Sequence, residues 1–114
     1  MTDARLPAHL EVGALIRAVD AAGGFGTVIA KGERDAGTLL IICGENDTKL
    51  RLYERMPQLD GTRQWTLVRS QDPENKIEFM EYWQRRKSQD SDLWIVELDI
   101  ANAERFIGLP GTIG

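Results

Sequence analysis

The sequence TLLIIC at residues 38–43 decides the fold, because it is apolar at almost every position. A strand with one wet face alternates apolar and polar side chains, whereas a strand covered on both faces is apolar throughout. The sequence LWIVEL at residues 93–98 has the same character apart from Glu97. We therefore expect these two segments, around Ile41 and Ile95, to be interior strands of one sheet.

A helix and three further strands are expected before the second of these segments. Apolar residues spaced by three and four positions predict a first helix over residues 8–22, which Gly23 and Gly24 end. Three further segments lie between turn signals, and each is rich in β-forming residues or alternates between apolar and polar residues. These segments predict strands over residues 25–31, 49–55 and 64–69.

A second helix is expected between the last two strands. Asp72 can cap free amides and Pro73 suits the first helical position, so the helix should begin there and end near Lys87. Its apolar residues share one broad face, with Tyr82 at the edge, and are Ile77, Phe79, Met80 and Trp83. One last helical turn is expected over residues 103–107.

The chain is expected to form a single α+β domain over residues 1–108, with a flexible C-terminal tail over residues 109–114. The order α-β-β-β-β-α-β predicts a mainly antiparallel sheet of about five strands with two helices. Four strands joined by short turns favour a meander, and both helices are expected to cover one face. Because the interior strands are apolar on both sides, the other face needs a cover from a loop, the C-terminal segment or a second subunit.

Composition and charge exclude several classes of protein. The chain has 114 residues and a formal net charge of −4 at pH 7, which argues against non-specific nucleic-acid binding by bulk charge. No apolar run approaches the roughly 18 residues of a membrane helix, and the N-terminal residues lack the features of a signal peptide, so we expect a cytoplasmic protein. Cys43 and His9 are the only residues of their kinds, so a zinc site built from Cys and His ligands is excluded within one chain. Cys43 is expected to be a buried thiol.

Several short segments together resemble a known family. They are Arg5-Leu6, ALIR at residues 14–17, DAG at residues 35–37, Leu52-Tyr53, and DLWIVE at residues 92–97. This set resembles a small bacterial family catalogued only as a domain of unknown function, over nearly the whole chain up to about Phe106. The resemblance implies a bacterial cytosolic protein, and it assigns no activity and no catalytic residue.

One strand carries the clearest candidate for a binding surface. Strict alternation places Lys49, Arg51, Tyr53 and Arg55 on one face of the strand over residues 49–55. Three cations around an aromatic ring can neutralise phosphates while the ring stacks on a base, or they can contact an acidic protein. A solvated sheet face explains the same alternation without any ligand, and we favour that interpretation.

No arrangement of side chains in the sequence indicates a catalytic site, a metal site or a cofactor. Asp35 with Asp47 and Lys49 resembles the carboxylates and lysine of metal-dependent nucleases, but both aspartates lie in expected turns, where Asp is common for local reasons. Lys31, Glu33 and Asp35 share one polar turn, whose solvation argues against an acid or base with a shifted pKa. An enzyme is therefore not the favoured interpretation, and a small metal-dependent hydrolase or nuclease is kept only as an alternative.

Trp83 and Trp94 are candidate interface residues, because tryptophan is enriched where proteins contact each other. A core position is the favoured explanation, since Trp83 shares a helix face with Met80 and Trp94 shares a strand face with Val96. We expect a non-enzymatic binding or protein-interaction module whose partner is another protein or a second copy of the chain, as a homodimer. Nucleic-acid or other polyanion binding through the face of the strand over residues 49–55 is the alternative.

Overall fold

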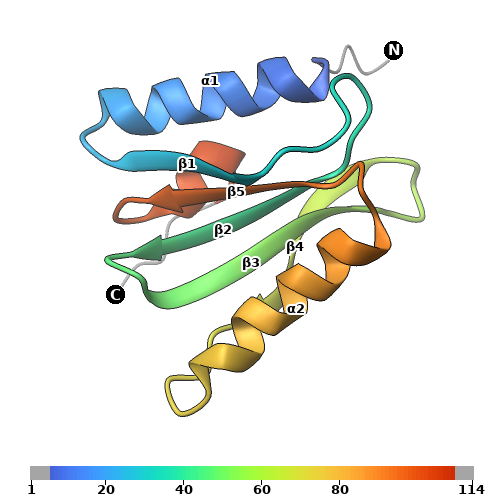
Figure 1. Ribbon diagram of the computed structural model, residues 1–114. Coiled ribbons are helices and arrows are strands. Elements are labelled where there is room, and N and C mark those ends of the chain that lie inside the picture. Colours follow the sequence, from blue (N-terminus) through green and yellow to red (C-terminus); the bar gives the residue numbers. More distant parts are fainter. Residues whose placement is uncertain (1–5, 110–114) are drawn as a thin grey trace.

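The computed structural model describes residues 6–109, which form one five-stranded sheet with a helix on each face (Figure 1). The strands lie in the order β1-β5-β2-β3-β4. The strands β5 (Trp94–Asp99) and β2 (Leu39–Glu45) both lie inside the sheet. The prediction that the segments around Ile41 and Ile95 are interior strands is therefore confirmed. The other elements are α1 (Ala8–Ala21), β1 (Phe25–Ala30), β3 (Thr48–Pro57), β4 (Arg63–Ser70), α2 (Lys76–Gln89) and the 3-10 helix η1 (Ala103–Ile107).

The sheet is mostly antiparallel. The prediction of a four-strand meander was wrong for the first of these strands, β1. β2, β3 and β4 form a meander, whereas β5 lies between β1 and β2, antiparallel to β1 and parallel to β2. The reason is the apolar character of β5, whose residues Trp94 to Val96 are buried on both faces. An edge position would leave one side of such a strand without a partner, so the last strand takes a place inside the sheet.

The two helices cover opposite faces of the sheet, so the expectation that both lie on one face was wrong. Val12 and Val19 of α1 pack with Ile41 and Val96 in one core cluster, which η1 completes. Phe79 of α2 packs in a second cluster on the other face, with Leu40, Ile42, Leu52 and Ile95. The cover that the two-sided apolar strands required is therefore supplied within one chain.

Each helix covers only part of its face. α1 contacts β1 and β5, at one end of the sheet. Figure 1 shows α2 in front of β3 and β4, at the other end, and its side chains contact both strands, with Arg86 on Glu54 and Tyr82 against Arg69. On the α2 face, the part of the sheet near β1 is therefore left without a helix.

The second helix begins at Lys76, three residues later than the sequence predicted. The Asp72 carboxylate accepts a hydrogen bond from the Glu74 amide (2.9 Å), and the Asp72 carbonyl accepts one from the Asn75 amide (2.9 Å). These bonds form a local turn, so Asp72 closes a turn before the helix instead of capping its first amides. α2 then runs two residues past Lys87, to Gln89.

The C-terminal segment adds to the core as far as Leu109. Leu109 packs against the cluster that contains α1, and residues 110–114 of the predicted tail lie outside the described residues. Within residues 6–109, neither helix is long and apolar enough to cross a membrane.

Candidate functional site

The face of β3 that carries the predicted basic surface is directed toward α1 and η1, and it is not a solvated face. Tyr53 is only 9% exposed and belongs to the core cluster on that side. Arg51 and Arg55 are half-buried, while Lys49 is exposed near the start of the strand. The alternation was predicted correctly, but the expectation of a wet face was wrong, because η1 and the N-terminal part of α1 contribute side chains to it.

A buried carboxylate neutralises Arg51. Glu104 of η1 is 3% exposed and accepts hydrogen bonds from both Nε and Nη2 of Arg51, the latter at 3.1 Å. The Tyr53 hydroxyl donates to the same carboxylate at 2.8 Å. Burial disfavours the charged form of Glu104, but the hydrogen bonds from Arg51 and Tyr53 outweigh that effect and lower its pKa. The cluster therefore fixes η1 on the sheet as an ion pair.

Arg55 also has a carboxylate partner from another element. Its two terminal nitrogens donate to Glu11 of α1 at 2.7 and 2.9 Å, and its guanidinium lies 4.8 Å from the centre of the Trp65 ring. Sequence reasoning missed Glu11 and Glu104, because each lies far along the chain from the arginine that it binds. The only signal for Glu104 was a carboxylate beside the apolar residues Ala103, Phe106 and Ile107 of the last turn. Polyanion binding by this face stays a prediction, and two of its three cations already have internal partners.

The two tryptophans proposed as interface residues contact their own chain. Trp94 is buried in the core, and its indole nitrogen donates to the Glu33 carbonyl at 2.6 Å. Trp83 is half-buried and packs against the core cluster on the α2 face. An interface role for either residue stays a prediction.

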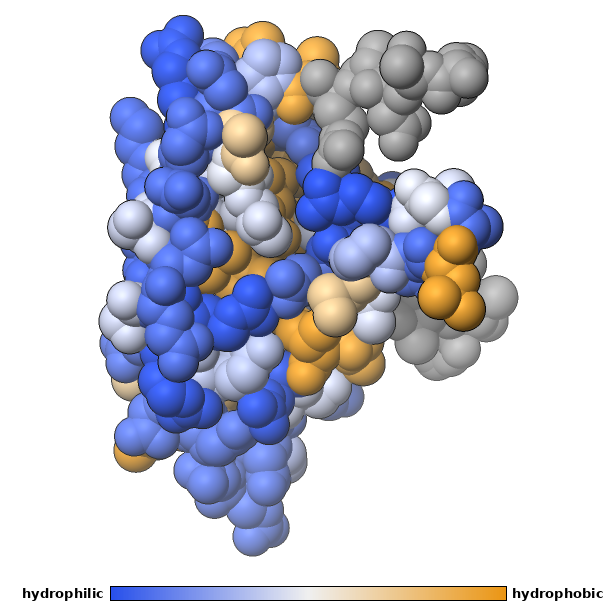
Figure 2. Space-filling model, turned by 90° about the vertical axis from the view of Figure 1, so that its right-hand side faces the viewer, coloured by the Kyte–Doolittle hydropathy of each residue, from blue (hydrophilic) through white to orange (hydrophobic). Residues whose placement is uncertain are grey.

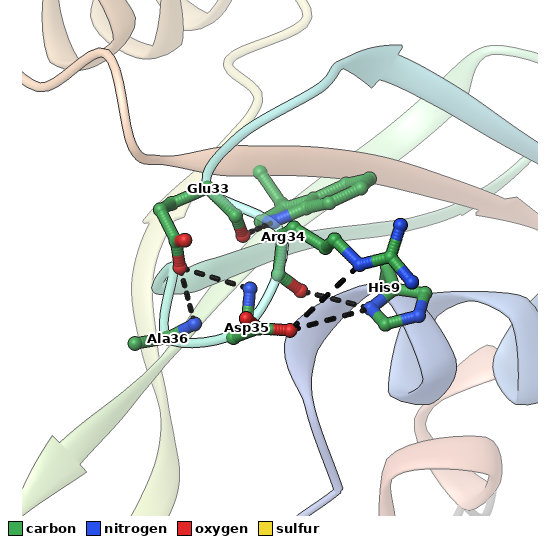
Figure 3. A network of polar contacts seen from close by, with 6 residues as sticks. His9, Glu33, Arg34, Asp35 and Ala36 are labelled. Atoms are coloured by element: carbon green, nitrogen blue, oxygen red, sulfur yellow. Dashed lines mark hydrogen bonds and ion pairs between the residues drawn. The ribbon is translucent and has the colours of Figure 1, made fainter.

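A side chain of the polar turn between β1 and β2 stabilises the backbone of the same turn. Figure 3 shows Glu33 directed at the backbone of Asp35 and Ala36, and its carboxylate accepts hydrogen bonds from both amides. Asp35 is exposed, with Arg34 and His9 3.9 Å from its carboxylate. Asp47 lies in the turn at the opposite end of β2, so the structure does not bring the two aspartates together. Among the described residues, no three His, Cys, Asp or Glu side chains are grouped to hold a metal ion.

A polar cleft of about 400 Å³ lies between the start of α1, this turn and the start of β4. It opens at the end of the sheet that carries the β3–β4 hairpin, the side facing the viewer in Figure 2, where hydrophilic residues make up most of the surface. Its polar groups bond to one another. Glu11 and Arg55 form the ion pair described above, and the first amides of α1, at Ala8 and His9, donate to loop carbonyls at 2.9 Å. Few groups in this cleft are thus free to hold a ligand.

An apolar groove lies on the α2 face, between α2 and the part of the sheet that α2 leaves uncovered. It has a volume of about 280 Å³. Ile77 and Met80 stand at its rim, 63% and 43% exposed, although both belong to the apolar face of the helix. The remaining apolar walls come from three strands and the helix, and they are Ile29, Ile42, Leu50, Phe79 and Trp83.

Charged groups converge on this apolar groove. Glu97 of β5 and Asp47 of the β2–β3 turn line it, and Lys76 lies at the start of α2. Burial, and then repulsion from Asp47 and Asp99, raises the pKa of Glu97. An apolar concave surface with a few convergent polar groups and a perturbed carboxylate is the arrangement typical of a binding site. We therefore take this groove as the candidate site; none of the residues predicted to bind lines it, although Trp83, a predicted interface residue, does.

Comparisons with known proteins identify relatives along almost the whole chain. A crystal structure of a DUF1491 family protein from Caulobacter crescentus CB15 is similar with 30% identity and a TM-score of 0.78, over 93% of this chain and 98% of that one. An NMR structure of a DUF1491 family protein from the same organism is similar with 28% identity and a TM-score of 0.75, over 95% and 97%. The solution structure of a protein from A. tumefaciens is similar with 30% identity and a TM-score of 0.66, over 95% and 99%.

No curated protein matches the chain. The family model described as "Protein of unknown function (DUF1491)" matches residues 6–108, which span every helix and strand of the fold. The expected resemblance to a domain of unknown function is confirmed, and the chain belongs to the DUF1491 family.

Proposed function

We propose that the protein is a non-enzymatic interaction module, and that it holds an apolar side chain of a partner protein in the groove between α2 and the sheet. The observation that carries this proposal is the exposure of Ile77 and Met80 beside an apolar concave surface. Apolar side chains on the inner face of an amphipathic helix are normally buried. Here they border an open groove, and an arriving apolar group would remove their surface from water.

The size of the groove favours a side chain over a cofactor. Sites for small molecules and cofactors usually enclose roughly 300–1,000 Å³. The groove, at about 280 Å³, is at the lower limit of this range and is open to solvent. Its volume suits one or two apolar side chains, while the segment that carries them would lie across the rim formed by Ile77 and Met80.

The polyanion alternative has less support. Glu11 and Glu104 already bind two of the arginines that a phosphate would need, and a phosphate would have to displace those carboxylates. An exchange of one anion for another gains little free energy when the resident carboxylate is already well placed.

A titration with a neutral capped dipeptide, acetyl-Leu-Gln-amide, tests the proposal. We expect chemical-shift changes in NMR spectra at amides of α2, β2 and β5 around the groove. Met80→Glu should weaken binding several-fold, because it places a charge at the apolar rim. Leu59→Glu, an equally drastic change at an exposed position in the β3–β4 hairpin, is the matched control. If no shifts occur up to the solubility limit, or if Met80→Glu leaves the affinity unchanged, the groove is not the binding site.

A further inference from the structure

We infer that the partner segment carries a lysine or arginine beside its apolar side chain, and that Asp47 and Glu97 receive this cation at the sheet end of the groove. The inference rests on the proposed function and names the chemistry of the partner. It follows from where the two carboxylates lie relative to the apolar walls.

The two carboxylates come from different elements and line the same groove. Glu97 lies on β5, paired with Thr27 of β1 and with Ile42 of β2, which is itself an apolar wall of the groove. Asp47 lies in the turn that joins β2 to β3. An apolar side chain held against Ile42 would therefore place its neighbouring residues within reach of Glu97.

The charge at this end of the groove is negative. Asp99 lies two residues after Glu97, on the same face of β5, and adds a third carboxylate. Lys76 is the cation among the groove's lining residues, and it stands at the start of α2. Within residues 6–109, neither Asp47 nor Glu97 takes part in an ion pair. Burial is the main cause of the raised pKa of Glu97, and a cation from outside would relieve the repulsion from Asp47 and Asp99 that adds to it.

Other features of the groove also favour a cation over an anion or a neutral group. Electrostatic complementarity between partners selects the correct partner and speeds encounter, even where it adds little affinity. The long apolar stem of a lysine or arginine can lie along Ile29 and Ile42 while its charged end reaches Glu97. A negatively charged segment would face the carboxylates directly.

Three capped dipeptides that differ in one charge test the inference, namely acetyl-Leu-Lys-amide, acetyl-Leu-Gln-amide and acetyl-Leu-Glu-amide. We expect the lysine peptide to bind about threefold to fivefold tighter than the glutamine peptide, a difference typical of partly exposed charge pairs. The glutamate peptide should bind weakest. The advantage of the lysine peptide should shrink at high salt, because salt screens partly exposed charges.

Charge-removing variants assign the effect to these carboxylates. Glu97→Gln and Asp47→Asn should each reduce the ratio of the affinity for the lysine peptide to the affinity for the glutamine peptide. Glu81→Gln, an equal change of charge at an exposed position of α2 outside the groove, should leave the preference intact.

The outcomes separate the inference from the proposed function. Equal affinity for the lysine and glutamine peptides overturns the inference and leaves the apolar groove as a binding site. Failure of all three peptides to bind removes the proposed function as well. A dimer in light scattering that Met80→Glu dissociates would assign the groove to a second copy of the chain, and would also overturn the inference.

Discussion

Replacing Glu104 with alanine should destabilise the protein by about 3 kcal/mol, a large share of the roughly 5–15 kcal/mol by which domains are usually stable. Glu104 is 3% exposed and accepts three hydrogen bonds, two from Arg51 and one from Tyr53. Without it, the buried Tyr53 hydroxyl has no acceptor, which costs about 1–3 kcal/mol. The side chain of Arg51 is 28% exposed, so water can solvate part of its charge and the loss stays below that of a fully buried pair.

Urea denaturation followed by tryptophan fluorescence measures this loss, and the melting temperature should fall by about 10–20 °C. Glu104→Gln keeps the shape and should cost less than Glu104→Ala. The double variant Arg51→Met with Glu104→Leu should recover part of the stability, because apolar residues can replace a buried ion pair at little cost, while the Tyr53 hydroxyl still lacks its acceptor. A loss below about 1 kcal/mol for Glu104→Ala, or additive losses in the double variant, would refute the description of this cluster as a coupled ion pair.

Acid should reveal the same cluster. The pKa of Glu104 is lowered in the folded state, so its contribution to stability is complete above its unfolded pKa near 4.5 and is lost as the pH falls through the folded pKa. The wild type should therefore lose more stability than Glu104→Gln when the pH is lowered through this range. Equal pH dependence in the two proteins would show that the carboxylate does not gain its charge-dependent hydrogen bonds on folding.

Three further predictions concern single positions. Glu97→Gln should raise the free energy of unfolding at neutral pH by about 0.5 kcal/mol after solvent screening. Folding raises the pKa of this carboxylate, so its contribution to stability is present at low pH and is lost as the pH rises; urea denaturation at two pH values checks this. Gly32→Ala should prevent stable folding, since its Cβ would lie 2.1 Å from the Asp92 carbonyl oxygen. Gly61→Ala is the control for thermal melts: Gly61 has a φ of 88° but no atom near its added Cβ, so this variant should cost only about 1 kcal/mol. Burial raises the pKa of the Cys43 thiol to about 12, so a thiol reagent at pH 8 should modify Cys43 only in urea, and rapid reaction of the folded protein would contradict its buried position.

The sequence predicted the elements of the fold better than their arrangement in space. Helical spacing and turn residues are local signals, and the first helix and the strands around Ile41 and Ile95 lie where they were expected. The position of β5 between β1 and β2 depends on pairing between segments that are far apart in the chain. The apolar face of a helix indicates that the helix packs against the sheet, but it does not indicate which face of the sheet it covers. The positions of α1 and α2 on opposite faces could therefore not be derived from periodicity alone.

The basic strand face shows a similar limit for the site. Alternation correctly predicted that Arg51 and Arg55 share one face of β3, because side-chain direction in a strand is a local property. Their partners, Glu104 and Glu11, lie 53 and 44 residues away in the chain. A solvated face and a face closed by carboxylates from other elements have the same alternation, so only the three-dimensional structure distinguishes them. The groove was missed for the same reason, since its walls come from β1, β2, β3, β5 and α2.

Glu97 links the stability of the sheet to the proposed partner. It interrupts the otherwise apolar sequence LWIVEL in a central strand, and folding raises the pKa of its carboxylate, so the charged form costs stability at neutral pH. Residues that conflict with the local pattern at a cost in stability are found mainly where function requires them. If Glu97 is kept to bind a cation, Glu97→Gln must both stabilise the free protein and reduce the preference for lysine. A stabilised variant that prefers the lysine peptide as strongly as the wild type does would separate the two effects, and the charge of Glu97 would then have no explanation in ligand binding.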